Sequence, residues 1–227
     1  EDVRDFVVSK TPNGDNVNAG INARVEIDGL GNYDGNVGST FEIKKKDISD
    51  PYAIIAMLTT SSMEFTGEEL EAPEIVQYRL GLDTLQLERD KDYFISYRDH
   101  IHVAYDENGN LLAKATAIIE GTQNFYGTIE KTFTITPKTL KLSELKVTAT
   151  GGDGVPKEFK DFVFPYWGKE VLPEDDYGYG FDLEYTIGGK KQRLVESADY
   201  VISYENNDKI GTAQMVISGN GKYAGSV

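Results

Sequence analysis

The chain has 227 residues, contains no cysteine, and carries 38 acidic against 23 basic side chains, for a formal net charge of −15. A surface of this sign repels phosphate backbones and anionic lipid headgroups, so neither nucleic acid nor a membrane surface is expected as a partner. No apolar run approaches the roughly 20 residues of a membrane span, so membrane insertion is not expected either.

Short runs of alternating apolar and polar residues, rich in Thr, Val, Tyr and Gly, fill the chain, and long segments with helical periodicity are missing. This pattern predicts an all-β protein. The absence of cysteine does not assign the chain to the cytosol, because modules of about 90 residues bury enough apolar surface to fold without disulfides.

The first predicted strand, 5–9, opens a pattern that returns later in the chain. It reads Asp-aromatic-x-x-Ser and recurs at 92–96 and 199–203. A second strand follows each copy, and its alternate residues are expected to point into a core. These inward residues are Ala23, Val25 and Ile27 in the first copy, Ala115, Ala117 and Ile119 in the second, and Ala213, Met215 and Ile217 in the third.

A turn framed by two glycines comes after the second strand of each copy. It spans 29–35, 121–127 and 219–225, and its central aromatic residue is expected to pack over the end of a sandwich. In the first two copies a Phe-x-Ile strand follows, at 41–43 and 133–135. The leading glycines lie 92 and 98 residues apart, which is the length of a small β-sandwich.

The opening part of the repeat occurs twice. An aromatic-x-Gly motif at 65–67 precedes Pro73, and one at 166–168 precedes Pro173, where proline suits the start of a strand. The second copy also has a longer insertion at 98–112, which is expected to form an extended hairpin tip.

The repeat predicts that the chain divides into three parts. Residues 1–46 hold the late half of a first module, 47–137 a complete module, and 138–227 a module that lacks its last strand. The boundaries fall near 44–46 and 136–138.

The motifs together resemble the immunoglobulin-like repeats strung along surface proteins of anaerobic Gram-positive bacteria. The third copy carries the resemblance best, at 166–169, 199–207, 211–213 and 219–225. The resemblance implies tandem Ig-like antiparallel β-sandwich modules on the extracellular surface of a bacterial cell. It also implies a non-catalytic stalk or spacer of a large adhesin-like protein, whose partners are neighbouring modules of the same protein. A β-grasp fold is the alternative architecture.

The rival function is a glycan- or host-protein-binding module, accessory to a surface glycosidase. Trp167, Tyr177 and Tyr179 belong to the densest aromatic cluster and are candidates for stacking on a sugar or a protein partner. In the alternative, Trp167 covers a junction between modules while Tyr166 and Phe181 lie in the core. Coplanar exposed rings would favour binding, and buried rings would favour the spacer.

Two groups of side chains are candidates for metal binding. Glu174, Asp175 and Asp176 follow a proline in a predicted loop, and calcium prefers clustered oxygen ligands. A solvated acidic loop is the alternative, and no cofactor other than calcium is expected. His100 and His102 would share one face of a strand and could bind zinc, or they lie on a solvated hairpin face.

We do not expect an enzyme. There is no cysteine nucleophile, and both histidines lie in one insertion, so Ser-His-Asp geometry could be built only there. Carboxylate pairs are abundant throughout this acidic chain and select no site. An intramolecular cross-link between a lysine and an asparagine stays open, because no pattern selects the pair.

The two ends of the chain are expected to expose apolar surface. Phe6, Val8, Val25, Phe41 and the other apolar residues of 1–46 have only half a sandwich to pack in. Three explanations stay open: strand addition between two molecules, a smaller module that closes on itself, or neighbouring sequence that covers the face.

Overall fold

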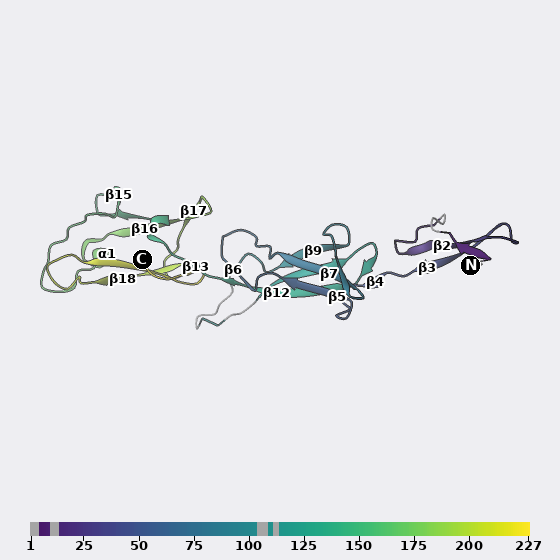
Figure 1. Cartoon of the computed structure of the whole chain (residues 1–227). Coiled ribbons are helices and arrows are strands. Elements are labelled where there is room, and N and C mark those ends of the chain that lie inside the picture. The colour runs from purple at the N-terminus through teal and green to yellow at the C-terminus, as the bar shows by residue number, and fades with distance from the viewer. Residues whose placement is uncertain (1–4, 10–13, 104–108, 111–113) are drawn as a thin grey trace. The chain divides into compact units, whose positions relative to one another are not determined.

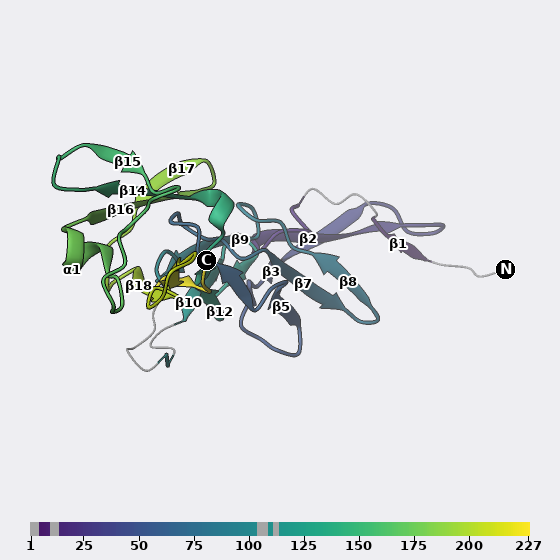
Figure 2. The same ribbon diagram turned by 90° about the vertical axis from the view of Figure 1, so that its left-hand side faces the viewer.

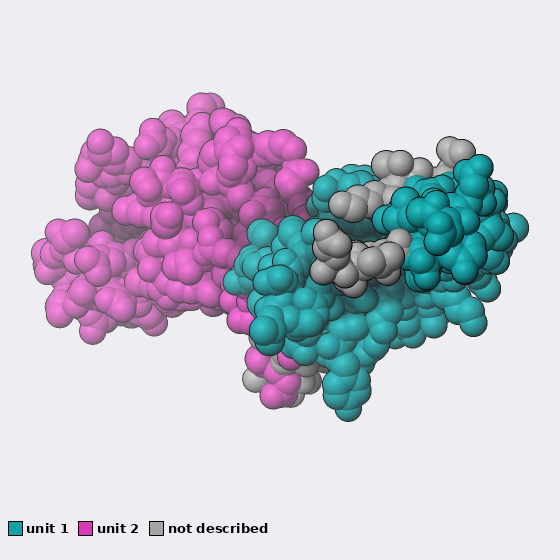
Figure 3. Space-filling model, turned by 45° about the vertical axis from the view of Figure 1, so that its right-hand side comes forward, with its two compact units in different colours: residues 1–59, 73–98, 116–131 teal, residues 60–72, 99–115, 132–227 magenta. Residues whose placement is uncertain are grey.

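The computed structural model describes residues 5–9, 14–103, 109–110 and 114–227. The chain divides into two compact units (Figure 3). The first unit comprises residues 1–59, 73–98 and 116–131, and the second comprises 60–72, 99–115 and 132–227. The division at 46 and 137 drawn from the sequence stays a prediction, and much of the expected hairpin tip within 98–112 lies outside the described residues.

Nearly all regular structure is β-strand (Figure 1), which confirms the all-β prediction. Only a five-residue α-helix and a three-residue 3-10 helix interrupt the strands in the described part of the chain. None of the described helices is long and apolar enough to cross a membrane.

The first unit opens with an antiparallel sheet in the order β1-β2-β3. Its strands are β1 (Phe6–Val8), β2 (Gly20–Gly29) and β3 (Asn36–Ile43). Alternation of side chains places Phe6, Val8, Ile27, Val37 and Phe41 on one face of this sheet.

The rest of the first unit surrounds one hydrophobic core. A second antiparallel sheet has the order β5-β7-β8, with strands β5 (Ile54–Leu58), β7 (Glu74–Leu80) and β8 (Asp83–Gln86). β9 (Tyr93–Arg98) pairs antiparallel with β10 (Ala115–Gly121), and β4 (Lys46–Asp47) pairs parallel with β11 (Phe125–Tyr126). The buried core cluster consists of Ile48, Ile54, Val76, Leu87, Tyr93, Ile119 and Phe125.

Parallel pairs that involve a short strand also occur in the second unit. β6 (Ser62–Glu64) runs parallel to the end of β12 (Thr128–Thr136), and β13 (Lys138–Thr139) runs parallel to β20 (Tyr223–Ala224). A four-stranded antiparallel sheet has the order β15-β14-β16-β17 (Figure 2). The remaining elements are η1 (Leu142–Glu144), β14 (Leu145–Thr150), β15 (Pro156–Glu158), α1 (Pro173–Tyr177), β16 (Gly180–Ile187), β17 (Lys190–Arg193), β18 (Tyr200–Glu205) and β19 (Gln214–Gly219).

The same strand register occurs at three places along the chain. In each, the aromatic residue of the Asp-aromatic pattern lies opposite the leading glycine of the turn, and the residue two positions later lies opposite an isoleucine. The pairs are Phe6 with Gly29 and Val8 with Ile27, Tyr93 with Gly121 and Ile95 with Ile119, and Tyr200 with Gly219 and Ile202 with Ile217. We call these the first, second and third hairpins.

The aspartate that begins each hairpin has a physical role. Its carbonyl oxygen accepts a hydrogen bond from the residue after the leading glycine, at 2.8 Å for Asp5, 2.9 Å for Asp92 and 2.8 Å for Asp199. In the second and third hairpins its side chain also accepts the backbone N–H four residues earlier, from Glu88 and Val195, both at 2.9 Å. The carboxylate thereby closes the loop that precedes the strand.

Glycine is required at the leading position of the turn because backbone approaches it closely. A Cβ at Gly219 would lie 2.6 Å from the backbone nitrogen of Ala224. The second glycine of the third turn, Gly225, has a φ of 77°, where an L side chain is strained. Local chemistry therefore fixes each turn.

The predicted inward residues of the second strands are only partly buried. All three residues of the second hairpin, together with Ala23 and Ile217, are buried, whereas Val25 and Ala213 are exposed, contrary to the prediction. The face that carries Val25 is largely uncovered, and β19 begins only after Ala213. Among the described residues of 1–46, Phe6, Val8 and Phe41 are likewise exposed.

The two prolines that follow the aromatic-x-Gly motifs lie at the start of different kinds of element. Pro73 directly precedes β7, as expected. Pro173 begins α1, so Glu174, Asp175 and Asp176 lie in a short helix and not in the predicted loop. Proline is well tolerated at this place because the first helical N–H needs no partner within the helix.

Candidate functional site

An aromatic row lies in the second unit between 159 and 181. Neighbouring rings in it have centroids 4.9 to 6.2 Å apart. Its members are Phe159, Phe162, Phe164, Trp167, Tyr177, Tyr179 and Phe181. Most of these contacts are tilted or edge-to-face, the arrangement that aromatic rings favour when they pack together.

Trp167 and Tyr177 form the outer end of this row. Their rings are nearly parallel, with an interplanar angle of 12° and centroids 5.4 Å apart. The hydroxyl of Tyr177 donates a hydrogen bond to the carbonyl oxygen of Pro165 at 2.8 Å, which fixes the ring. Trp167 is 53% exposed, so Tyr177 supports an indole that still faces solvent.

Polar groups lie beside the exposed indole. The Nζ of Lys169 lies 5.6 Å from the centroid of the Trp167 ring, within the range of a cation–π contact. The same ammonium is 2.9 Å from Oδ1 of Asp176. Hydrogen bonds from the backbone N–H of Leu172 and from Lys169 lower the pKa of Asp176, so this carboxylate is charged at neutral pH.

The predicted binding residues are therefore only partly brought together. Trp167 and Tyr177 stack directly, whereas Tyr179 is half-buried and packs edge-on against Phe162 and Phe164. The three rings do not form the coplanar exposed strip that would mark an extended platform. Phe159, Phe162 and Phe164 were not among the predicted binding residues, although their close spacing ahead of Trp167 in the sequence was a visible signal.

Tyr166 is exposed, contrary to its expected place in the core. Phe65 holds the equivalent place in the earlier aromatic-x-Gly motif and is buried. The two positions differ in their neighbours. Phe65 packs edge-on against Tyr223, whereas no aromatic ring of the described residues packs against Tyr166 in this way.

Two of the three predicted calcium ligands accept hydrogen bonds from protein donors. Oε2 of Glu174 accepts the hydroxyl of Tyr204 at 2.7 Å, and Oδ2 of Asp176 accepts the backbone N–H of Leu172 at 2.8 Å. Asp175 points to solvent. These hydrogen bonds compete with calcium for the carboxylate oxygens, and calcium binding here stays a hypothesis.

The two histidines lie in an irregular segment and not in a strand. The Nε2 of His100 is 3.8 Å from Oε2 of Glu69, and the side chain of His100 is largely buried, which differs from a solvated hairpin face. Among the described residues, no group of three His, Cys, Asp or Glu side chains is placed to hold a metal ion.

A second candidate site in the second unit is the contact of β6 with the segment after β12. Phe65 packs edge-on against Tyr223, which also packs edge-on against Tyr185 at a centroid distance of 5.7 Å. Nζ of Lys138 is 2.7 Å from Oε2 of Glu64, and the backbone N–H of Thr139 donates to Oε1 of the same carboxylate at 3.2 Å. We call Glu64, Phe65, Lys138, Tyr185 and Tyr223 the junction cluster.

The junction cluster accepts hydrogen bonds from the backbone between β12 and β14. The hydroxyl of Tyr185 lies 2.7 Å from Oε2 of Glu144 and accepts the backbone N–H of Lys141 at 3.1 Å. The hydrogen bond from Lys138 lowers the pKa of Glu64, and burial raises the pKa of Tyr185 to about 12. Both groups are therefore in the protonation states that these contacts require at neutral pH.

Comparison with known proteins adds no relative, since no family model, no curated protein and no solved structure matches the chain.

Proposed function

We propose that the chain is a run of tandem immunoglobulin-like β-sandwich modules that acts as a non-catalytic stalk or spacer of a large extracellular bacterial surface protein. The recurrence of one hairpin register and one turn geometry at three places supports a modular origin. The resemblance of the sequence motifs supports the bacterial surface setting.

The junction cluster is the observation that carries the spacer role. A spacer must resist bending where one module succeeds another, and a linker of few residues helps only if its backbone is held. Around the predicted boundary at 137, Lys138, Thr139 and Lys141 are all held by side chains of the junction cluster. An edge-to-face aromatic contact between Phe65 and Tyr223 adds an apolar anchor.

Distances between two spin labels test this role. Because the chain has no cysteine, Leu82→Cys and Val163→Cys, both at strongly exposed positions, allow specific labelling. We expect a narrow distance distribution that broadens with Phe65→Ala or Lys138→Ala. The exposed Tyr126→Ala serves as the control and should leave the distribution unchanged. A distribution that is equally broad in all variants would contradict a stiff spacer.

A glycan-binding role is the second candidate, and the exposure of Trp167 above Tyr177 favours it. Aromatic faces bind the apolar faces of sugars, and Lys169 and Asp176 offer hydrogen-bonding groups beside the ring. Affinity electrophoresis in gels that contain bacterial or host polysaccharides tests it. Retardation should be lost with Trp167→Ala and kept with the exposed Tyr52→Ala, and a chain that no polysaccharide retards would rule this role out.

A further inference from the structure

The third glycine-framed turn carries an asparagine followed by a glycine, Asn220 and Gly221. Asn-Gly pairs also occur at 13–14 and 108–109, but only at 220–221 does the structure describe both residues, and both are exposed there. Asparagine is chemically labile because its carboxamide can react with the backbone nitrogen of the next residue. A glycine in that next position leaves the nitrogen unshielded, since it has no Cβ.

The side chain of Asn220 is turned toward the nitrogen with which it would react. The backbone N–H of Gly221 donates to Oδ1 of Asn220 at 2.9 Å. Among the described residues, no backbone carbonyl accepts this N–H. Gly221 also has a φ of 59°, which a glycine adopts without strain. The nitrogen therefore lies in solvent beside the carboxamide and takes no part in the backbone hydrogen bonding of the turn.

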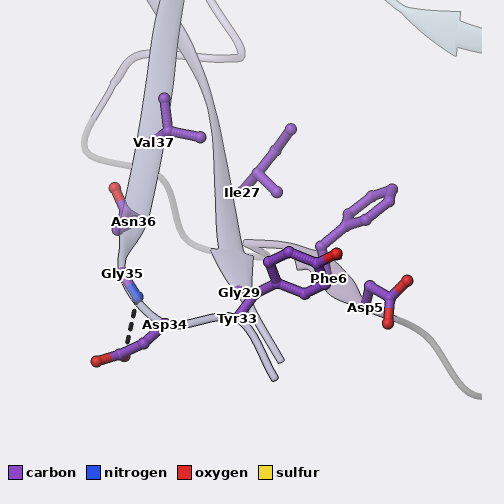
Figure 4. Close-up of a pocket in the computed structure, with 9 residues that line it drawn as sticks. All are labelled: Asp5, Phe6, Ile27, Gly29, Tyr33, Asp34, Gly35, Asn36 and Val37. Carbon is purple, nitrogen blue, oxygen red and sulfur yellow. Dashed lines mark hydrogen bonds between the residues drawn. The ribbon is translucent and has the colours of Figure 1, made fainter. Parts of the chain in front are cut away.

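The first hairpin contains the same contact with a less reactive group. Figure 4 shows the backbone N–H of Gly35, which donates to Oδ1 of Asp34 at 2.8 Å. The group attacked at Asp34 would be a carboxylate, whose negative charge makes it a poorer electrophile than a carboxamide. Asp34 is therefore a slow reference within the same chain.

Asn124 in the second turn shows the opposite arrangement. The next residue is Phe125, whose side chain is buried and whose N–H donates to the carbonyl oxygen of Thr122 at 2.9 Å. The carboxamide of Asn124 accepts the N–H of Ala19 at 2.7 Å and donates to Oδ1 of Asn18 at 3.0 Å. Both groups that would have to react are engaged elsewhere, so Asn124 is the matched asparagine that should stay intact.

We propose that Asn220 is a site of spontaneous deamidation in the folded chain. The backbone nitrogen of Gly221 loses its proton to solvent base and forms a bond to Cγ of Asn220. The carbon–nitrogen bond of the carboxamide then breaks and releases ammonia. Water opens the resulting succinimide ring at either of its carbonyls, which leaves aspartate or isoaspartate at position 220. This modification goes beyond the spacer role and does not depend on it.

The reaction removes contacts that hold the third turn. Nδ2 of Asn220 donates to the carbonyl oxygen of Ser197 at 2.7 Å, and the carboxylate of either product has no proton to donate there. Isoaspartate also reroutes the backbone through the former side chain, so the carbonyl that accepts the N–H of Tyr223 at 3.1 Å is displaced. Both products add a negative charge near the buried Asp199, whose carbonyl oxygen accepts the N–H of Asn220 at 2.8 Å. Deamidation therefore loosens the turn that carries Tyr223.

Peptide mapping by mass spectrometry tests the proposal on the full folded chain, held in mildly alkaline buffer. We expect the peptide that contains 220–221 to exchange its NH2 group for OH at least tenfold faster than the peptide that contains Asn124. Labelling by an isoaspartate methyltransferase should likewise appear at 220 at least tenfold faster than at Asp34.

The chain unfolded in urea shows the reactivity of the pair without the fold. The folded chain should convert at 220 within tenfold of that rate. Conversion in urea but not in the folded chain would overturn the proposal, because the fold would then protect the pair. Conversion at Asn124 as fast as at Asn220, or no conversion at 220 in either state, would overturn it as well.

Asn220→Gln is the matched variant for the effect on the turn. It keeps a carboxamide but closes a ring far more slowly, and it leaves the Asn-Gly pairs at 13–14 and 108–109 unchanged. Calorimetry of fresh and aged protein should show that the transition of the second unit falls in the parent chain and stays constant in the variant. An equal fall in both proteins would show that deamidation of Asn220 does not loosen the turn.

Discussion

Phe65 and Tyr223 meet edge to face, with ring centroids 6.1 Å apart and ring planes at 89°. Phe65 directly follows β6, and Tyr223 is the central aromatic residue of the third glycine-framed turn. The contact thus joins a segment before the predicted boundary at 137 to a turn near the end of the chain. Both side chains are buried, so the contact contributes packing as well as aromatic attraction.

We predict an energetic coupling between these two residues. In a double-mutant cycle of Phe65→Leu and Tyr223→Leu, urea denaturation should give a coupling of about 0.5–1.5 kcal/mol, the range of aromatic pairs. The cycle of Tyr166→Leu with Tyr223→Leu is the control, because Tyr166 makes no described contact with Tyr223. Equal coupling in both cycles would argue against a specific contact.

Ile119 and Ile217 occupy equivalent places in the second and third hairpins, and both are buried. We predict that Ile119→Ala and Ile217→Ala each lower the free energy of unfolding by about 2–5 kcal/mol, as truncations in a packed core do. Calorimetry should show that each variant lowers a different transition, because Ile119 belongs to the first unit and Ile217 to the second.

The fully exposed Leu82→Ala is the matched control for these truncations and should change stability by less than about 0.5 kcal/mol. If both isoleucine variants lowered the same single transition by the same amount, the two hairpins would belong to one cooperative core.

Acid should remove the contribution of Glu64 to the free energy of unfolding. The hydrogen bond from Lys138 lowers the pKa of Glu64 from its ordinary value of 4.5 in the folded chain. A lowered folded pKa stabilises the protein above pH 4.5, and this stabilisation is lost as the pH falls through the folded pKa. The stability difference between the parent chain and Glu64→Gln should therefore be constant near neutral pH and shrink below pH 4.5.

Urea denaturation at a series of pH values measures this difference. In a Lys138→Met background the pH dependence attributable to Glu64→Gln should largely disappear. A difference that persists unchanged without Lys138 would mean that another group lowers the pKa of Glu64.

Calcium should not control folding. Because Glu174 and Asp176 already accept hydrogen bonds from Tyr204 and Leu172, we predict the same melting temperature in EDTA and in millimolar calcium. Calorimetry measures this directly, with magnesium as the control for ionic strength. A rise in melting temperature with calcium that Asp175→Asn and Asp176→Asn abolish would establish the site that the sequence suggested.

The sequence by itself determined the hairpin strands and the glycine-framed turns. The Asp-aromatic-x-x-Ser pattern, the alternation of the next strand and the glycine-framed turn lie within about 35 residues of one another in the first and third hairpins. Their geometry follows from local steric limits at glycine and from the two-residue period of a strand. Three hairpins in one register are the result.

Only the tertiary structure decided which faces are covered. Phe41 and Phe133 stand in the same local pattern, yet one is exposed and the other buried, and the same holds for Tyr166 and Phe65. Burial depends on segments far away in the sequence, such as β4 for the second hairpin and Tyr223 for Phe65. No local pattern encodes the presence of such a partner, and for this reason the pairing of Glu64 with Lys138 emerges only from the folded chain.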